Sequence, residues 1–191
     1  MAIAVSQKMS LEDFLVYDDG TDYLYELENG ELVRMPSESE INRRIAMFLV
    51  SFFLGISIPT QRLSMKTELE VSGQRATVRI PDLVLFSEDL AIALQGASRS
   101  IVRMDMPPPE LIVEIVSPKQ ENRDYRYKRS EYAARGITEY WIIDPNKSQL
   151  LLLEWVEGLD EEPMYSGDKK IGSPLFGELD LDVARIMSAG A

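Results

Sequence analysis

The stretch of sequence that organises this chain covers residues 107–144 and reads PPPELIVEIVSPKQENRDYRYKRSEYAARGITEYWIID. It opens with an apolar run at 111–116 between prolines, a pattern that predicts a strand buried on both faces. A helical pattern follows at 124–135 and ends at Gly136, before a second strand-like run at 140–144. Strand, helix and strand in this order predict a crossover unit whose two strands lie side by side.

Two charged residues of this unit occupy positions that the pattern predicts to be buried. Glu114 lies in the middle of the apolar run, and a buried carboxylate needs a partner cation, a metal ion or a raised pKa. Lys128 shares one helical stripe with Tyr125 and Tyr132, so its side chain should face inward. The crossover therefore predicts that Lys128 lies near Glu114.

The composition limits the chemistry that is available to the chain. A chain of 191 residues, 45% hydrophobic and 27% charged, has the size and composition of one globular domain. It contains no cysteine and no histidine, which excludes disulfides, thiol chemistry, Cys/His zinc sites and histidine-based triads. Catalysis would have to use carboxylates, lysine, hydroxyl groups or a metal ion bound by oxygen.

Charge and targeting signals bear on location and partners. The first ten residues lack the apolar core of a signal peptide, and no apolar run approaches membrane-spanning length, so we expect a cytoplasmic protein. The net charge of -12 opposes binding of polyanions unless a cation or a local basic patch offsets it. Two such basic clusters exist, at Arg43 and Arg44 and at Arg123, Arg126 and Arg129.

Turn and capping signals predict the elements that precede the crossover. Ser10 with Asp13 and Ser37 with Glu40 resemble capping boxes, the second opening a helix to about residue 54. Asn29-Gly30 is a strong hairpin signal. The other expected elements are a second hairpin of strands 63–71 and 76–86 around 72–75, a short helix at 89–94, and a strand at 150–156 followed by acidic loops and an apolar segment at 175–187.

Three residues in apolar surroundings are the candidates for chemistry: Asp82, Glu114 and Lys128. Two carboxylates on neighbouring strands favour a Mg²⁺ site, and a nearby lysine could orient water or offset charge on a phosphate. The alternative is structural: Asp82 caps the turn after Pro81, Glu114 pairs with an arginine such as Arg79, and Lys128 extends from its helix into solvent. On spacing alone the structural alternative is favoured, because isolated acids in strands are more often paired than catalytic.

A resemblance changes that balance. The segments Pro81-Asp82, Glu114-Ile-Val-Ser-Pro118, Asp124-Tyr-Arg-Tyr-Lys128 and Glu139-Tyr-Trp-Ile-Ile-Asp144 together resemble the Uma2 family, once a domain of unknown function and described as restriction endonucleases of the PD-(D/E)XK nuclease superfamily. The likeness extends over most of the chain and implies a single domain over residues 1–191. The implied fold is α/β, a restriction-endonuclease-like core with a central mixed sheet flanked by helices.

The resemblance also implies roles for individual residues. Asp82 matches the aspartate of the PD motif and Glu114 the acid of the (D/E)XK motif, and together they would bind the metal. The superfamily's lysine usually lies two residues after that acid, where this chain has Val116. Lys128 matches the lysine that Uma2-like sequences carry on the following helix, and Lys119 is a rival.

Two further positions are possible additional site residues. Glu26 falls in the family's upstream acidic motif, although an acid in a hairpin is more often solvated. Related sequences commonly carry a histidine near the start of the helix after the first hairpin, where this chain has Asn42. This departure puts activity in question more than fold.

The implied function is a Mg²⁺- or Mn²⁺-dependent endonuclease that hydrolyses DNA phosphodiester bonds by metal-activated water. The alternative is a catalytically inactive nuclease fold that serves as a binding or interaction module, which the negative charge and Asn42 favour. We also expect a homodimer, since nucleases that cut duplex DNA often pair two sites and the apolar segment 48–53 offers a surface. Otherwise that segment, like Tyr132, Tyr140 and Trp141, belongs to the core.

Overall fold

The computed structural model describes residues 8–72, 76–117, 123–154 and 163–191, and its centre is a six-stranded mixed sheet. In the described part of this sheet, the strand that carries Glu114 and the strand that carries Ile142 run parallel and place these two residues opposite each other. The other pairs of neighbouring strands run antiparallel. The α/β fold with a central mixed sheet is therefore confirmed. In spatial order the strands are β11 (Met164–Ser166), β10 (Gln149–Glu154), β9 (Glu139–Asp144), β8 (Leu111–Ile115), β6 (Leu83–Leu85) and β3 (Leu63–Ser64).

The predicted crossover connects the two parallel strands β8 and β9. Its helix begins with a π-helical turn, η2 (Arg123–Lys128), and continues as α4 (Arg129–Arg135). Gly136 ends the helix in a left-handed conformation, with φ of 80°. The π-helical turn, which was not predicted, is wider than an α-helical one and carries Lys128 at its end.

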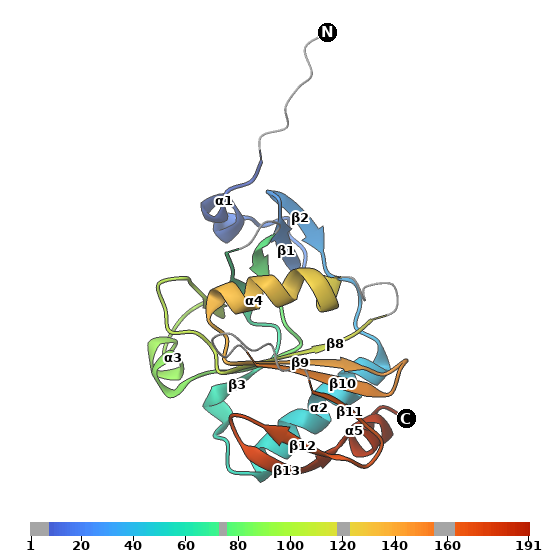
Figure 1. Cartoon of the computed structure of the whole chain (residues 1–191). Helices are drawn as coiled ribbons and strands as arrows, with labels where there is room; N and C mark the ends of the chain where they lie inside the picture. The colour runs from blue at the N-terminus through green and yellow to red at the C-terminus, as the bar shows by residue number, and fades with distance from the viewer. Residues whose placement is uncertain (1–7, 73–75, 118–122, 155–162) are drawn as a thin grey trace.

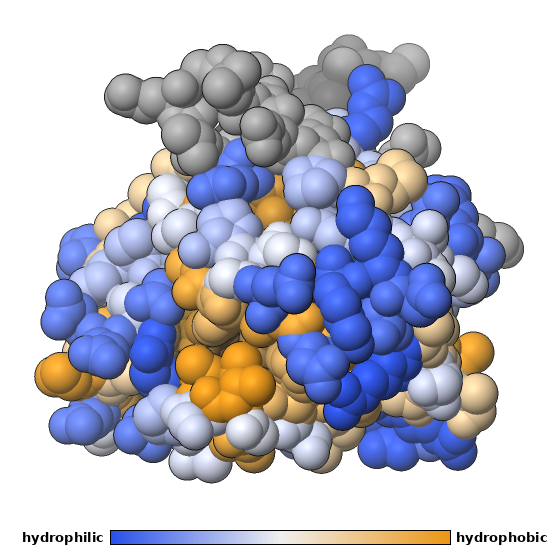
Figure 2. All heavy atoms as spheres, turned by 60° about the horizontal axis from the view of Figure 1, so that its bottom comes forward, coloured by the Kyte–Doolittle hydropathy of each residue, from blue (hydrophilic) through white to orange (hydrophobic). Residues whose placement is uncertain are grey.

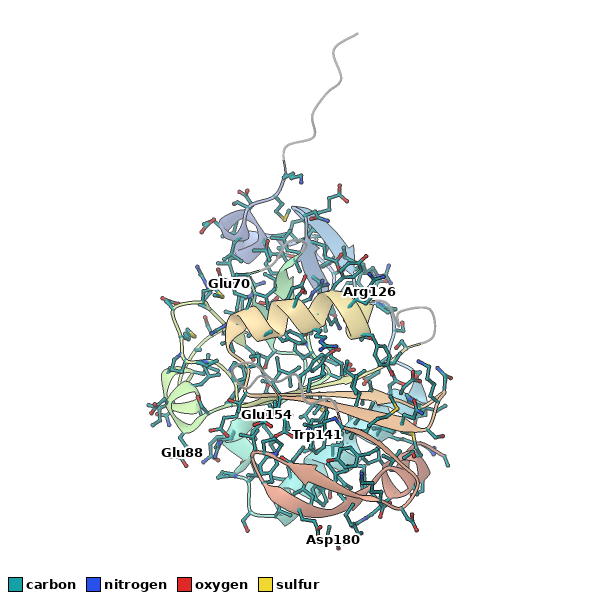
Figure 3. The ribbon with its side chains drawn as sticks, in the orientation of Figure 1. Glu70, Glu88, Arg126, Trp141, Glu154 and Asp180 are labelled. Atoms are coloured by element: carbon teal, nitrogen blue, oxygen red, sulfur yellow. The ribbon has the colours of Figure 1, made fainter. Side chains whose placement is uncertain are left out.

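Helices cover both faces of the central sheet (Figure 1). On one face lies α4, and on the other lie α2 (Glu40–Gly55), α5 (Val183–Gly190) and the hairpin of β12 (Lys170–Ser173) and β13 (Gly177–Asp182). Apolar side chains fill both interfaces, with Ile45, Leu49 and Phe53 of α2 against Trp141 on one side, and Tyr132 and Tyr140 on the other. Trp141 points from the sheet toward the α2 layer (Figure 3). The core positions of Tyr132, Tyr140, Trp141, Leu49 and Phe53 are confirmed, whereas Phe48 and Phe52 of the same apolar segment are only partly buried.

A second sheet of five strands lies on the α4 side of the central sheet (Figure 1). The two sheets are joined at Ile80-Pro81-Asp82, where the chain passes from β5 to β6. Its strands, in spatial order, are β2 (Glu31–Arg34), β1 (Tyr25–Glu28), β5 (Ala76–Arg79), β4 (Glu68–Glu70) and β7 (Ile101–Val102).

The prediction of two continuous strands at 63–71 and 76–86 was wrong. Each segment is divided, because its first half pairs in one sheet and its second half in the other: β3 pairs with β6, and β4 with β5. Pro81 interrupts the second segment, since proline lacks the N–H group that a ladder needs. Lys66 interrupts the first in a left-handed conformation, with φ of 61°. Of the predicted turn at 72–75, residues 73–75 lie outside the described residues.

The local signals near the N-terminus are largely confirmed. Ser10 and Asp13 form the capping box of α1 (Leu11–Val16), and Asn29 and Gly30 both have positive φ, as the tight hairpin turn requires. The cap of α2 was predicted wrongly. Ser39, directly before the helix, accepts a hydrogen bond from the Asn42 N–H at 3.1 Å, in place of Ser37.

The remaining expectations have mixed outcomes. The helix expected at 89–94 is α3 (Glu88–Ala93), capped by Ser87, and the strand expected from residue 150 is β10. Its expected end at 155–156 lies outside the described residues. No helix in the described part of the chain is long and apolar enough to cross a membrane.

Candidate active site

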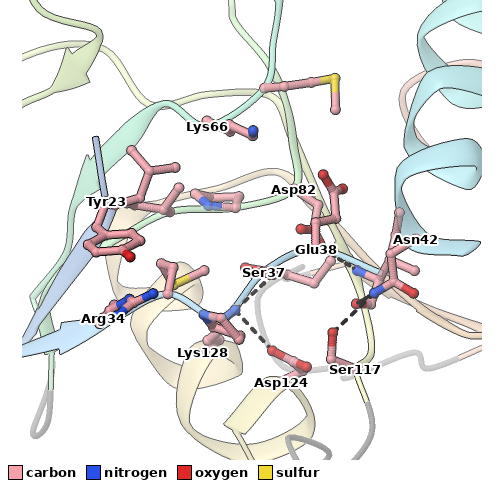
Figure 4. Close-up of a pocket in the computed structure, with 18 of the residues that line it drawn as sticks. Tyr23, Arg34, Ser37, Glu38, Asn42, Lys66, Asp82, Ser117, Asp124 and Lys128 are labelled. Carbon is pink, nitrogen blue, oxygen red and sulfur yellow. Dashed lines mark hydrogen bonds and ion pairs between the residues drawn. The ribbon is translucent and has the colours of Figure 1, made fainter. Parts of the chain in front are cut away.

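A cavity of about 220 Å³ opens where the two sheets meet (Figure 4). Its walls come from the first hairpin, the start of α2, the bend between β5 and β6, the end of β8 and the η2 turn. The structure brings Asp82, Glu114 and Lys128, the three residues singled out from the sequence, to this one cavity, together with Asn42 and Asp124.

Asp82 lies in the bend between β5 and β6, and its carboxylate contacts the neighbouring strand. Its Oδ2 accepts a hydrogen bond from the backbone N–H of Ile115 at 2.6 Å. The structural alternative placed this side chain on the turn after Pro81, whereas its hydrogen-bond partner is β8. Burial raises the pKa of Asp82 to about 6, even though the hydrogen bond from Ile115 acts to lower it.

Glu114 lies on β8 with its side chain buried between the sheet and the η2–α4 helix. Its Oε2 is 2.8 Å from Lys128 Nζ, and its Oε1 accepts a hydrogen bond from the Tyr132 hydroxyl at 2.6 Å. Burial raises the pKa of Glu114 to about 8, although the charge of Lys128 opposes the shift. The alternative pairing of Glu114 with Arg79 was wrong.

Lys128 is buried at the end of η2 and contacts two acids at once. Its Nζ lies 2.8 Å from Glu114 Oε2 and 3.0 Å from Asp124 Oδ1 (Figure 4). Burial acts to lower the pKa of Lys128, but the carboxylates of Glu114 and Asp124 outweigh burial and hold the pKa above its ordinary value. The ammonium group therefore stays charged at neutral pH, and the alternative of a lysine extending into solvent was wrong.

The cavity has an excess of negative charge. Three carboxylates, those of Asp82, Glu114 and Asp124, line the cavity together with the Lys128 ammonium group, and the buried Asp124 Oδ1 lies 3.0 Å from Lys128 Nζ. Within the described residues no three carboxylates are grouped closely enough to hold a metal ion by themselves. The donor set fits Mg²⁺, which takes one or two carboxylates and completes its coordination with waters and phosphate oxygens. To bind the metal, Glu114 would have to offer it the carboxylate oxygen that now contacts Lys128.

The model of one protein family, Uma2, described as "Putative restriction endonuclease", matches residues 11–184. This chain belongs to the Uma2 family. Its fold is similar to that of a solved structure described as a "putative nuclease belonging to DUF820" from Anabaena variabilis, with 19% identity, a TM-score of 0.76, and 96% of this chain and 99% of the other covered. No curated protein matches the chain.

Asn42, at the position where the resemblance implies a histidine, is buried in the cavity wall. Its Nδ2 donates to the backbone carbonyl of Ile115 at 2.9 Å and to Ser117 Oγ at 3.1 Å. Because an amide does not titrate at neutral pH, Asn42 cannot transfer protons as a histidine can. In this Uma2 chain it holds the end of β8 against the start of α2.

Glu26, the other possible site residue, is buried behind the cavity and does not line it. It accepts hydrogen bonds from Arg79 at 2.7 Å and from the Ile80 N–H at 3.1 Å. Arg79 also binds Glu28 and Glu131, so this cluster joins the second sheet to α4. The contacts indicate that Glu26 supports the site from behind.

The candidate phosphate contacts and the rival lysine have different positions. Arg43 and Arg44 are exposed and bind Glu40. Arg126 lies on the exposed side of the helix (Figure 3). Lys119 lies outside the described residues, as does the side chain of Arg123.

Sequence reasoning missed two contributors to the site. Asp124 contacts Lys128 from four residues earlier, and this spacing on a helix was a readable signal. Tyr132 was predicted only as a core aromatic, and its hydrogen bond to Glu114 depends on how the helix packs over β8. No local pattern reveals such a contact.

Proposed function

We propose that this Uma2 chain is a Mg²⁺- or Mn²⁺-dependent endonuclease that hydrolyses phosphodiester bonds of DNA. The observation that supports the proposal best is the convergence of Asp82, Glu114 and Lys128 on one cavity with more buried negative than positive charge. In this account Asp82 and Glu114 hold the metal ion. When bound, the ion supplies an acidified water and a counter-charge for the phosphate.

The chain's own residues would divide the remaining tasks. Lys128, charged throughout the neutral range, would donate hydrogen bonds to a phosphate oxygen and stabilise the charge that develops there. Tyr132 orients the Glu114 carboxylate through its hydroxyl hydrogen bond. Asn42 holds the end of β8 so that Ile115 N–H keeps its hydrogen bond to Asp82.

The experiment that tests this function is nicking of supercoiled plasmid. Wild-type protein should nick the plasmid with Mg²⁺ or Mn²⁺ and not with EDTA. Lys128→Ala and Glu114→Gln should lower the rate by about 100-fold or more, the range for loss of one transition-state contact. Arg43→Ala, on the exposed start of α2, is the control for general weakening of DNA binding. Equal nicking by wild type and both site variants would contradict the proposal.

A second candidate function is an inactive nuclease fold that binds a partner. The observation that favours it is that both carboxylate oxygens of Glu114 already have partners, Lys128 for Oε2 and Tyr132 for Oε1. In that case the ion pair would be purely structural. A Mn²⁺ titration that leaves the melting temperature unchanged would favour this candidate, since a ligand that binds only the native state raises it.

We also propose that two copies pair through the outer side of α2. Phe48, Phe52 and Ile56 line a shallow groove there, with Asp180 and Arg185 at its edge. Asp180 pairs with Lys170 in its own chain but is exposed, so in a two-fold arrangement it can also meet the arginine of the other copy. Figure 2 shows this side of the molecule, with apolar side chains among polar ones. Sedimentation of a monomer at high concentration would contradict the dimer.

A further inference from the structure

We propose that Tyr23 and Arg34 form a platform on which an unpaired DNA base stacks at the cavity, so that this chain prefers single-stranded or frayed DNA to intact duplex. The inference rests on the proposed nuclease function, because it concerns the substrate of the same cavity. The platform would bind a base next to the residues that act on the phosphate.

The platform is an aromatic ring with a guanidinium group over its face. Arg34 Cζ lies 3.4 Å from the centroid of the Tyr23 ring. Both side chains are exposed and both line the cavity that holds Asp82, Glu114 and Lys128. Figure 4 shows the pair on the side of the cavity opposite Asn42 and Ser117. A flat surface of this kind offers the faces on which nucleic-acid bases stack.

The backbone holds the two residues in place without DNA. Arg34 ends β2 and is paired with Tyr25 of β1, two residues after Tyr23. The tight turn at Asn29 and Gly30 joins these strands, and β1 is paired on its other edge with β5. A platform that is ordered before binding loses little conformational entropy when a base stacks on it.

Electrostatics explain why stacking would matter in this chain. The net charge of -12 opposes the usual binding through backbone phosphates. At the cavity mouth Arg34 and Lys66 supply positive charge, but Asp22 and Glu38 line the same cavity and offset it. Base stacking uses the π-face of the base and not the phosphate charge, so it supplies affinity where phosphate contacts are few. A duplex with all bases paired could not use it.

The competing explanation is that the pair only packs the surface of the hairpin. Cation–π contacts between exposed side chains are common in proteins and stabilise them modestly. Under that explanation Tyr23→Ala lowers the melting temperature and leaves the preference between DNA forms unchanged. The two explanations therefore differ in a ratio of affinities, which a general loss of stability does not produce.

The test is fluorescence anisotropy with a labelled 15-nucleotide single strand and the blunt duplex of the same sequence. Ca²⁺ replaces Mg²⁺ so that the strands stay intact. Wild-type protein should bind the single strand more tightly. Tyr23→Ala should weaken that binding by about ten-fold, the effect of losing one stacked base, and change duplex binding by less than two-fold. Arg34→Lys keeps the charge but loses the planar group, and it should also weaken single-strand binding.

Two further variants guard against misfolding and surface effects. Tyr23→Trp enlarges the ring and should tighten single-strand binding, a gain that a damaged fold cannot produce. Tyr17→Ala removes another exposed tyrosine, outside the cavity, and should change neither affinity.

An unchanged single-strand to duplex ratio in Tyr23→Ala overturns the inference, as does equal binding of both forms by wild type. If the plasmid is nicked in either case, the proposed function stands without the platform. If wild type neither binds nor cleaves any DNA, both proposals fail.

Discussion

Lys128 Nζ lies 2.8 Å from Glu114 Oε2, and both side chains are buried where the η2 turn crosses β8. The contact joins the helix of the crossover to the strand beneath it. A buried ion pair of this kind is expensive to form, because both groups lose their hydration. Its position at a cavity with two further carboxylates indicates a role beyond packing.

Removing Lys128 should destabilise the metal-free protein. Lys128→Met keeps much of the side-chain volume but leaves Asp124, and above about pH 8 also Glu114, buried without a counter-charge, so the free energy of unfolding should fall by about 3 kcal/mol. Urea denaturation measures the change. The matched control is Lys147→Met, which breaks the pair with Asp144 but removes a half-exposed lysine, and it should cost at most about 1 kcal/mol. Equal losses of unfolding free energy in the two variants would show that the buried Lys128 pair contributes no more to stability than a half-exposed pair.

The raised pKa values predict how metal-free stability depends on pH. The pKa of Glu114 rises from 4.5 to about 8 on folding, so between these values the native state binds more protons than the unfolded state. The stability that Glu114 contributes is therefore fully present below about pH 4.5 and is lost as pH rises toward 8. Asp82 adds a loss between about pH 4 and 6. Lys128 is charged in both the native and the unfolded state over this pH range, so it does not contribute to the pH dependence of stability.

Comparison with Glu114→Gln isolates this contribution. In EDTA, the melting temperature of wild type should fall between pH 5 and 8 by roughly 5 °C more than that of the variant, which lacks the titrating group. Melts by circular dichroism at each pH provide the measurement. Parallel curves for the two proteins would mean that Glu114 titrates near its ordinary pKa.

The arginine behind the site should be a main determinant of stability. Arg79 is fully buried and binds Glu26, Glu28 and Glu131, so Arg79→Met would leave three carboxylates without their cation. We expect a loss of about 3–5 kcal/mol in urea denaturation. Arg43→Met, which breaks an exposed pair with Glu40, should change stability by less than about 1 kcal/mol. A small effect of Arg79→Met would mean that the cluster's attraction barely exceeds its desolvation cost.

The sequence predicted best those elements whose signals are local. The run 111–116 is buried on both faces, Gly136 ends its helix through a left-handed conformation, and Asn29-Gly30 makes a tight turn by itself. The interruption at Pro81 was less accessible, because the segment bends to pair with two different sheets. Pairing partners distant in sequence decide such a bend. The hairpin of β12 and β13 was also missed, since half of its positions face solvent and show no apolar stripe.

The site residues, like the elements, were predictable where the signal was local. Glu114 and Lys128 stood out because each charge interrupts an apolar pattern, and the crossover geometry predicted their meeting. Asp82 was also a candidate from its apolar surroundings, and the resemblance implied its role as a metal ligand. Its hydrogen bond from the Ile115 N–H was not predicted, since the bond spans two strands that are far apart in sequence. Glu26 shows the limit of both approaches. Its burial against Arg79 depends on the assembly of the second sheet.

The most direct test of the account is calorimetric titration of the metal-free protein with Mn²⁺ at pH 6, 7 and 8. If Asp82 and Glu114 share a metal ion, wild type should bind one ion per chain and release protons on binding, because Glu114, with a pKa of about 8, must lose its proton. Proton release should be smaller at pH 8 than at pH 6. Glu114→Gln and Asp82→Asn should each weaken binding by at least ten-fold while the fold survives. Absence of binding in wild type, or unchanged binding in both variants, would contradict the central claim.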